Sequence, residues 1–139
     1  MITIKQVDVE CIDVFWDDVR DWIQKAADQS NGRHTIISTY RLLKENKMTL
    51  FVVLKNQILK AAYVVQRVVY PNLNTLCILF CGGSEILKNM KQLETFFCQY
   101  AKENNCARLE IIGRKGWIKA IKKDKLKLQH TGYFYEMVT

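Results

Sequence analysis

The chain has 139 residues, of which 49% are hydrophobic, and it carries a formal net charge of +7. This length and composition predict one domain spanning 1–139 with an apolar core, and a single proline with six glycines excludes long disordered linkers. No apolar run approaches the roughly eighteen residues of a membrane helix, and the N-terminal stretch MITIKQVDVE does not read as a signal peptide, so we expect no membrane segment.

The first part of the chain predicts one strand followed by two helices. Residues 2–9 alternate apolar and polar side chains, which is typical of a strand. Residues 11–29 carry apolar side chains at spacings of three and four, which predicts an amphipathic helix. The SNGR stretch at 30–33 breaks this pattern, and 35–46 then predicts a second, shorter helix.

The middle of the chain predicts a meander of three strands. MTLFVVL (48–54), ILKAAYVVQRVVY (58–70) and TLCILFC (75–81) are rich in β-branched and aromatic residues. The short polar stretches KNQ and PNLN separate them and read as turns.

The last part of the chain predicts a helix, a strand, a short basic helix and a final strand. The helix spans 84–104, the strand 107–113, the basic helix 116–124 and the final strand 133–138. Elements in this mixed order predict an α/β fold with helices packed on both faces of one sheet. The strand–helix–strand unit from 75 to 112 should be a right-handed parallel crossover.

The positive charge is concentrated in one segment. Residues 114–127, RKGWIKAIKKDKLK, hold seven basic residues and one acidic residue, a net charge of +6. Its lysines recur on one helical face, which is most simply a solvated surface. The same face could instead bind an acidic protein surface or the 3′-phosphate of a nucleotide. No nucleic-acid partner is expected, because the chain shows no known DNA- or RNA-binding motif.

The cysteines and histidines predict neither a disulfide framework nor a metal site. The five cysteines show no CxxC spacing, and the two histidines lie far apart. We expect buried thiols in a reducing cytoplasm, with Cys77 and Cys81 on the same face of one strand.

The order of elements resembles the fold of the GNAT superfamily of N-acetyltransferases over essentially the whole chain. AKENNCARLEII (101–112) is similar to the end of that family's third helix and the start of its fifth strand. GRKGWIKAIKK (113–123) is similar to a tract of GNAT-like proteins of short-tailed phages, some of which are virion components. The resemblance implies a mixed, mostly antiparallel sheet in which the one parallel strand pair opens into a V-shaped cleft.

The resemblance also implies a position for acyl-CoA, on the fourth strand and the start of the following helix. Helix N-termini favour anions such as a pyrophosphate. The family's Q/R-x-x-G-x-G/A motif falls on 83–88, which here reads G-S-E-I-L-K, with Ile86 and Lys88 where small residues are expected and Glu85 in the first turn. One alternative is a plain glycine turn in which Ser84 caps the helix. The other is a rearranged loop that binds acetyl-CoA through Leu79, Phe80, Cys81, Gly82, Gly83, Ser84 and Lys88.

No residue of the sequence receives a catalytic role. Many GNAT enzymes place a tyrosine general acid in the last helix, and the corresponding position here is Ile121. Tyr133 and Tyr135 lie on the expected final strand and read as packing or surface aromatics. Glu110 is either a general base or a solvated carboxylate.

Both histidines, His34 and His130, read as surface residues in loops.

Two functions follow as alternatives. The first is a GNAT-like acyltransferase that moves an acetyl group from acetyl-CoA to an amine on a small molecule or a protein. The second is a non-catalytic GNAT-fold binding or structural protein, such as a phage virion component, that uses the basic helix 115–127 to bind a partner. The protein would then reside in the host cytoplasm or in the virion, and its partners would be virion proteins or a second copy of itself.

Overall fold

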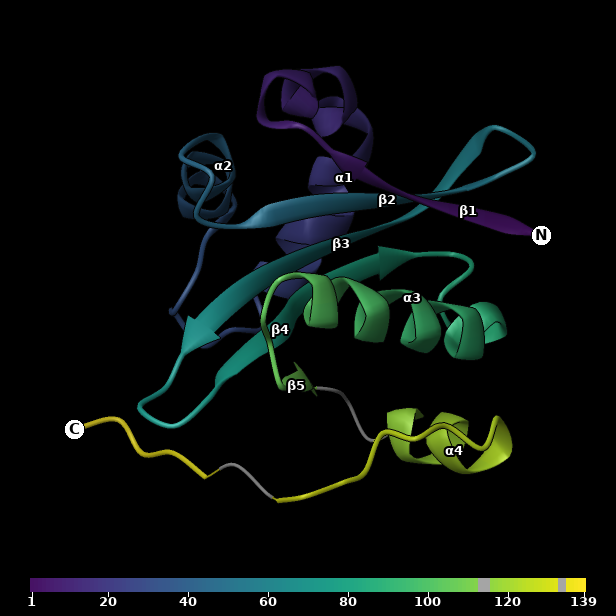
Figure 1. The fold of residues 1–139 in the computed structure, drawn as a ribbon. Helices are drawn as coiled ribbons and strands as arrows, with labels where there is room; N and C mark the ends of the chain where they lie inside the picture. Colours follow the sequence, from purple (N-terminus) through teal and green to yellow (C-terminus); the bar gives the residue numbers. More distant parts are fainter. Residues whose placement is uncertain (113–115, 133–134) are drawn as a thin grey trace.

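A twisted five-stranded sheet forms the centre of the molecule (Figure 1). The computed structural model describes residues 1–112, 116–132 and 135–139. Neighbouring strands pair in the order β1-β2-β3-β4-β5, antiparallel up to β4 and parallel between β4 and β5. The strands are β1 (Ile2–Val7), β2 (Thr49–Lys55), β3 (Ile58–Val69), β4 (Asn74–Gly83) and β5 (Arg108–Ile111).

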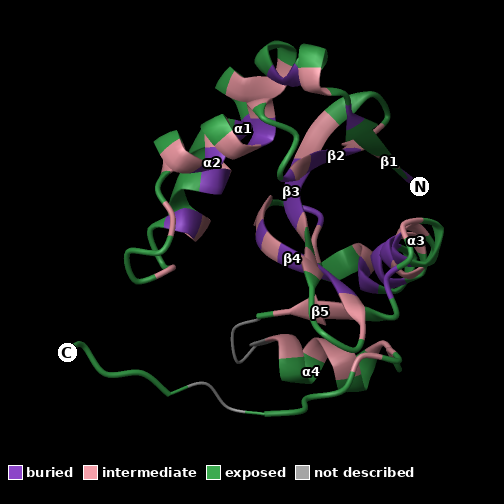
Figure 2. Ribbon diagram, turned by 60° about the vertical axis from the view of Figure 1, so that its left-hand side comes forward, coloured by how far each residue is buried: buried purple, intermediate pink, exposed green. Residues whose placement is uncertain are grey.

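Helices cover both faces of this sheet, so the chain folds as a single α/β domain (Figure 2). Helices α1 and α2 pack on one face, and α3 packs on the other, with α4 beneath it. The α-helices are α1 (Ile12–Ala27), α2 (Ile36–Lys44), α3 (Met90–Glu103) and α4 (Gly116–Lys123), and the short 3-10 turns are η1 (Val9–Cys11) and η2 (Leu87–Asn89).

The sheet separates two apolar cores, because successive side chains of a strand point to opposite faces. The core under α3 is built around Phe51, Tyr63 and Phe97, and the ring of Phe97 contacts the other two. In the core under α1 and α2 the fully buried side chains are aliphatic apart from Phe80, and the half-buried rings of Phe15, Trp16, Trp22 and Tyr40 pack against them. Strands β2 and β3 contribute to both cores and are therefore apolar on both faces, which explains their continuous hydrophobic sequence.

Local sequence signals fix where several elements begin and end. Helix α2 starts with a capping box, in which the Thr35 hydroxyl accepts a hydrogen bond from the Ser38 backbone N–H and the Ser38 hydroxyl accepts one from that of Thr35. Asn46 and Asn105 follow the ends of α2 and α3 with φ of 59°, a conformation that asparagine tolerates better than most residues. Asn56 and Gln57, with φ of 52° and 63°, form the two-residue turn between β2 and β3.

The structure confirms most of the expected elements and corrects two. The three-strand meander, the parallel β4–β5 pair and the four helices are present. The helix expected from residue 84 begins six residues later, at Met90. The final strand expected over 133–138 is not formed by its described residues, 135–138, and residues 133–134 lie outside the described part of the chain.

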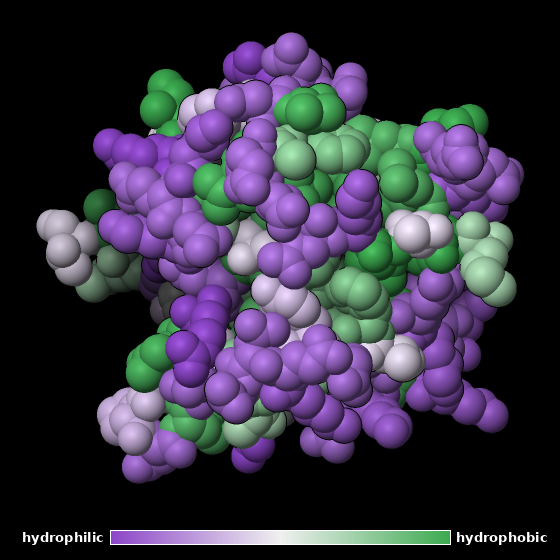
Figure 3. All heavy atoms as spheres, turned by 45° about the horizontal axis from the view of Figure 1, so that its top comes forward, coloured by the Kyte–Doolittle hydropathy of each residue, from purple (hydrophilic) through white to green (hydrophobic). Residues whose placement is uncertain are grey.

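The surface is mixed in character. On the face shown in Figure 3, hydrophilic residues surround an area of hydrophobic ones. No helix in the described ranges is both long and apolar enough to cross a membrane.

Candidate functional site

The pairing between the parallel strands β4 and β5 ends half-way along β4. Only four residue pairs join the two strands, from Thr75 opposite Arg108 to Ile78 opposite Ile111. Strand β4 continues for five more residues, 79–83. In the described part of the chain, four of these, 80–83, pair with β3 alone. Pairing between the two strands therefore ends at Ile78 and Ile111, where β5 itself ends. The expected V-shaped opening stays a prediction, because residues 113–115, which follow β5 closely, lie outside the described part of the chain.

A β-bulge marks the point of separation. Ile78 lies opposite Val65 and Phe80 lies opposite Val64, so Leu79 is an extra residue in β4. Leu79 and Phe80 both face the core under α1 and α2, whereas Ile78 faces the core under α3. A bulge leaves backbone groups outside the ladder and bends its strand, and this one falls directly after the last residue of β4 that pairs with β5.

The bulge also overturns the expectation for the two cysteines of this strand. Without it, Cys77 and Cys81 would share a face. Cys81 instead packs against the core under α3, and Cys77 lies between Leu76 and Ile78, which both face that core, and so points to the opposite face. Burial, with a smaller contribution from Glu110, raises the pKa of the Cys77 thiol to about 11. None of the five cysteines, all of them in the described part of the chain, forms a disulfide.

The two glycines at the end of β4 are required by close packing inside the protein. A methyl group on Gly82 would lie 2.7 Å from the Cβ of Trp22 in α1. Gly83 has φ of +124°, and a methyl group there would lie 2.2 Å from the carbonyl oxygen of Lys60. The glycines therefore let β4 approach α1 and β3, and this packing explains both positions without a ligand.

The loop between β4 and α3 is organised by a buried carboxylate. Glu85 is only 8% exposed; its carboxylate lies 3.8 Å from the Lys55 ammonium and accepts a hydrogen bond from the Asn89 side-chain amide at 3.3 Å. Ser84 does not cap α3, because both its backbone N–H and its hydroxyl donate to the Lys60 carbonyl oxygen. Lys88, in η2, is exposed.

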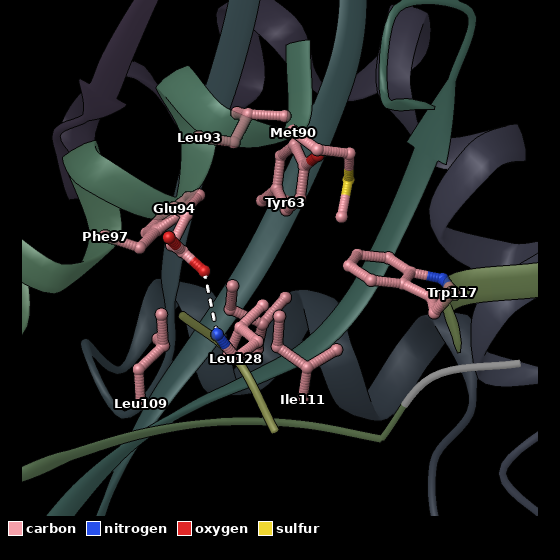
Figure 4. A pocket seen from close by; sticks show the side chains of 10 residues that line it. Tyr63, Met90, Leu93, Glu94, Phe97, Leu109, Ile111, Trp117 and Leu128 are labelled. Atoms are coloured by element: carbon pink, nitrogen blue, oxygen red, sulfur yellow. Dashed lines mark hydrogen bonds between the residues drawn. The ribbon is translucent and has the colours of Figure 1, made fainter. Parts of the chain in front are cut away.

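A small apolar cavity lies beneath the start of α3, next to Ile78 and Ile111, the last pair that joins β4 to β5 (Figure 4). Side chains from β3, β4, β5, α3 and α4 line it, and its free volume is about 10 Å³, close to the smallest space that holds one water molecule. In this view Trp117 of α4 lies at the right of the cavity, and Leu128 of the following segment lies below it.

One polar atom inside this cavity region has no partner in the described residues. The Tyr63 hydroxyl is buried and makes no hydrogen bond there. Burial, and secondarily the Cys81 thiol beside it, raises the pKa of this phenol well above its ordinary value. A buried hydroxyl is normally satisfied by protein, water or a ligand. Sequence reasoning did not single out Tyr63, because it lies within an apolar strand pattern.

A second buried carboxylate anchors the chain after α4. Glu94 of α3 is 8% exposed and accepts hydrogen bonds from the backbone N–H groups of Lys127, at 3.1 Å, and Leu128, at 3.0 Å. These two bonds hold the segment against α3, and Figure 4 shows the one from Leu128.

The opposite side of the bulge is approached by the loop between α1 and α2. The His34 ring packs edge-on against Phe80, with 5.3 Å between ring centroids. The Ser30 hydroxyl bonds both to the backbone N–H of His34, at 2.9 Å, and to its carbonyl oxygen, at 3.2 Å. Farther along the chain, the Glu136 carboxylate pairs with Arg33 and accepts a hydrogen bond from Asn31, which ties the C-terminal segment to the same loop.

The residues considered for catalysis from the sequence are not brought together by the fold. Ile121 lies half-buried in α4, and Tyr135 is 86% exposed outside any strand. Glu110 is half-buried on β5, opposite Cys77. Tyr133 lies outside the described residues. Among the described residues, no cluster of histidine, cysteine and acidic side chains could hold a metal ion.

Comparisons with known proteins identify the fold. No family model and no curated protein matches the sequence. Solved structures do match. A ribosomal-protein-alanine N-acetyltransferase from Brucella melitensis biovar Abortus 2308 superimposes with a TM-score of 0.67 at 11% identity, covering 100% of this chain and 99% of that one.

Two further structures agree. An aminoglycoside acetyltransferase from an uncultured soil metagenomic sample, crystallised with trehalose, matches with a TM-score of 0.68 at 14% identity, covering 99% of this chain and 97% of that one. A predicted acetyltransferase from Clostridium acetobutylicum, solved with acetyl-CoA, matches with a TM-score of 0.62 at 16% identity, covering 99% and 96%. The chain therefore has the GNAT acetyltransferase fold, and identities this low extend the similarity no further than the fold.

Proposed function

We propose that this protein is an N-acetyltransferase that transfers an acetyl group from acetyl-CoA to an amine. The observation that carries the proposal is the bulge at Leu79, where β4 leaves β5 and where the backbone of 79–83 loses its strand partner on that side within the described chain. Extended backbone of this kind can hydrogen-bond a ligand that lies along it as a strand would.

The residues fit acetyl-CoA at the strand. Leu79, Phe80 and Cys81 would hold the pantetheine arm through their backbone, and the unpartnered Tyr63 hydroxyl lies beside this position as a further polar group. The cavity near it is apolar and small, so a bound arm requires side chains such as Trp117 to move aside.

The phosphate end would rely on other groups than the expected glycines. The space that Gly82 and Gly83 leave open is filled by residues of α1 and β3. The Ser84 N–H donates a hydrogen bond to the Lys60 carbonyl oxygen. The pyrophosphate would therefore lie where η2 leads into α3, near the exposed Lys88. Glu85 opposes an anion there, and its contacts with Lys55 and Asn89 offset part of that charge.

When bound, acetyl-CoA supplies an acyl group on a thioester, whose C–S bond breaks as the amine nitrogen forms the new C–N bond. The protein contributes mainly position, because it holds the strand backbone fixed between two packed cores. Acceptors worth testing are those acetylated by proteins of this fold, namely the N-terminus of an alanine peptide and an aminoglycoside.

Release of the CoA thiol from acetyl-CoA, in the presence of each of these amines, tests the proposal. We expect thiol release that depends on both the protein and one of the amines. A protein that binds acetyl-CoA in calorimetry and yet releases no thiol with any amine would contradict the transferase activity.

A non-catalytic binding role is the second candidate. Lys119, Lys122 and Lys123 of α4 are exposed, and none of them makes an ion pair with a described residue. They form a cationic surface that fits an acidic partner. An origin in a phage, a place in a virion and a cytoplasmic location stay predictions, because neither the fold nor the comparisons bear on them.

A further inference from the structure

The loop between α1 and α2 presents an imidazole to the bulge in β4. His34 is half-buried, and its ring contacts Phe80, the residue next to Leu79. Both bulge side chains face the α1–α2 side of the sheet, so the His34 ring lies on that side. In the described part of the chain, no hydrogen bond or ion pair reaches the ring nitrogens of His34.

The backbone that carries this ring is held in place. The Ser30 hydroxyl bonds to both the N–H and the carbonyl oxygen of His34, and Thr35, the next residue, caps α2. The imidazole is half-buried, its backbone is fixed and one face of its ring is packed. Its ring nitrogens, which make no hydrogen bond to a described residue, therefore have no evident structural use. This is the arrangement expected of a group that exchanges a proton with a ligand.

We infer that His34 is the general base of the acyl transfer, taking a proton from the acceptor amine on the α1–α2 side of the β4 bulge. This inference rests on the proposed function, which places the thioester at the same bulge. The amine is therefore expected to approach from the His34 side, opposite the cavity under α3.

The proton balance is complete with an ammonium ion as acceptor. One ring nitrogen of His34 takes one proton from the ammonium group, which frees the lone pair that forms the C–N bond. The amine nitrogen of the acceptor loses a second proton as the C–S bond breaks, and the departing CoA thiolate takes up that proton. His34 then releases its own proton to solvent.

The local charges leave the imidazole in the form that this step needs. Burial lowers the pKa of His34 below its ordinary value, and burial is the one cause of that shift. The ring packs on Phe80, which is apolar, and the charged neighbour in the loop, Arg33, is paired with Glu136 of the C-terminal segment. His34 is therefore mostly neutral at pH 7 and becomes protonated as the pH falls.

The test compares His34→Gln with wild type, using acetyl-CoA and whichever of the alanine peptide and the aminoglycoside reacts faster. We expect kcat to fall at least about 100-fold while the Kd for acetyl-CoA stays within about threefold. The acidic limb of the pH–rate profile should disappear, and added imidazole should restore part of the rate. His130→Gln, the other histidine, is the matched control and should keep the wild-type profile.

Two results would overturn the inference, and they are distinguishable. If wild type transfers the acetyl group and folded His34→Gln does so within threefold of its rate, His34 is not the base and the proposed function stands. If wild type neither binds acetyl-CoA nor transfers the acetyl group, the proposed function and this inference both fall.

Ser30→Ala, which loosens the His34 backbone without touching the ring, should lower kcat less than His34→Gln does and should keep the acidic limb.

Discussion

Single residues at the end of β4 show how one position can serve packing where a ligand was expected. Gly82 and Gly83 lie where a phosphate-binding turn was predicted, yet the atoms nearest to them belong to Trp22, Lys60 and Ala61. A glycine that allows close approach of a ligand and one that allows close approach of a neighbouring strand have the same sequence signature. Contacts are needed to tell them apart.

Replacing Gly83 with alanine should destabilise the fold. The new methyl group would lie 2.2 Å from the Lys60 carbonyl oxygen, in a backbone conformation with φ of +124° that alanine rarely adopts. We expect the free energy of unfolding to fall by about 2 kcal/mol or more in urea denaturation. Gly132→Ala is the control, since nothing lies within 4 Å of its added methyl group, and equal stability of the two variants would refute the packing role.

The acidic face of α1 carries a pH-dependent contact with α2. The Tyr40 hydroxyl donates to the Asp13 carboxylate at 2.6 Å, and the Lys44 ammonium donates to it at 2.9 Å. These two bonds hold the pKa of Asp13 below its ordinary value, and the hydrogen bond from Tyr40 makes the larger contribution. Because the native pKa is the lower one, the contact is fully present above the ordinary Asp pKa of about 3.9 and is lost as the pH falls through the native pKa.

Tyr40→Phe should therefore raise the pKa of Asp13 toward the ordinary value, as followed by NMR of its carboxyl carbon. Asp17, one turn further along α1, has no such partner among the described residues and serves as the internal reference. A titration of Asp13 that is the same in the variant and in wild type would show that the Tyr40 hydrogen bond is not formed in solution.

At the scale of elements, most of the fold was predictable because each signal was local. The alternation in β1, the helical period in α1 and the turn between β2 and β3 were all read directly from the residues that form them. The bulge at Leu79 was not, because β4 is apolar on both faces and an extra residue leaves no break in that pattern. The start of α3 was misplaced for a related reason, since Ile86 and Leu87 continue the helical spacing before the helix begins.

The candidate site was predictable only in part. Strand β4 was chosen from its place in the order of elements, and its residues 79–83 extend beyond the pairing with β5. Tyr63 and His34 could not be selected, because one lies in an apolar strand and the other in a polar loop. Their surroundings come from residues far away in the sequence, such as Phe97 beside Tyr63 and Phe80 beside His34.

The anchor between α3 and the segment after α4 should depend on one carboxylate. Glu94→Gln keeps the shape of the side chain but loses the charge and one acceptor oxygen for the Lys127 and Leu128 amides. A loss of about 1–3 kcal/mol locally corresponds to hydrogen exchange at least about fivefold faster at these amides. The control is Glu103→Gln at the exposed end of α3, and unchanged exchange in Glu94→Gln would contradict the anchoring role.

For the molecule as a whole, the two proposed functions use different surfaces. The strand site lies along β4, whereas the cationic surface consists of the exposed lysines of α4. In the double variant Lys119→Glu, Lys123→Glu, the Kd for acetyl-CoA should stay within a few-fold of the wild-type value, because these side chains are assigned to a partner or to solvent. A loss of acetyl-CoA affinity of tenfold or more, about 1.4 kcal/mol, would place the cofactor on α4 instead.

The most direct measurement is amide-resolved NMR during titration of the wild-type protein with acetyl-CoA. We expect saturable shifts at Leu79, Phe80 and Cys81 and in the first turn of α3, with the amides of β1 unmoved at the far edge of the sheet. Shifts confined to the lysines of α4 would contradict the strand site. No shift at any amide at about 1 mM acetyl-CoA, a concentration at which a Kd of 1 mM gives half saturation, would contradict the acetyltransferase proposal itself.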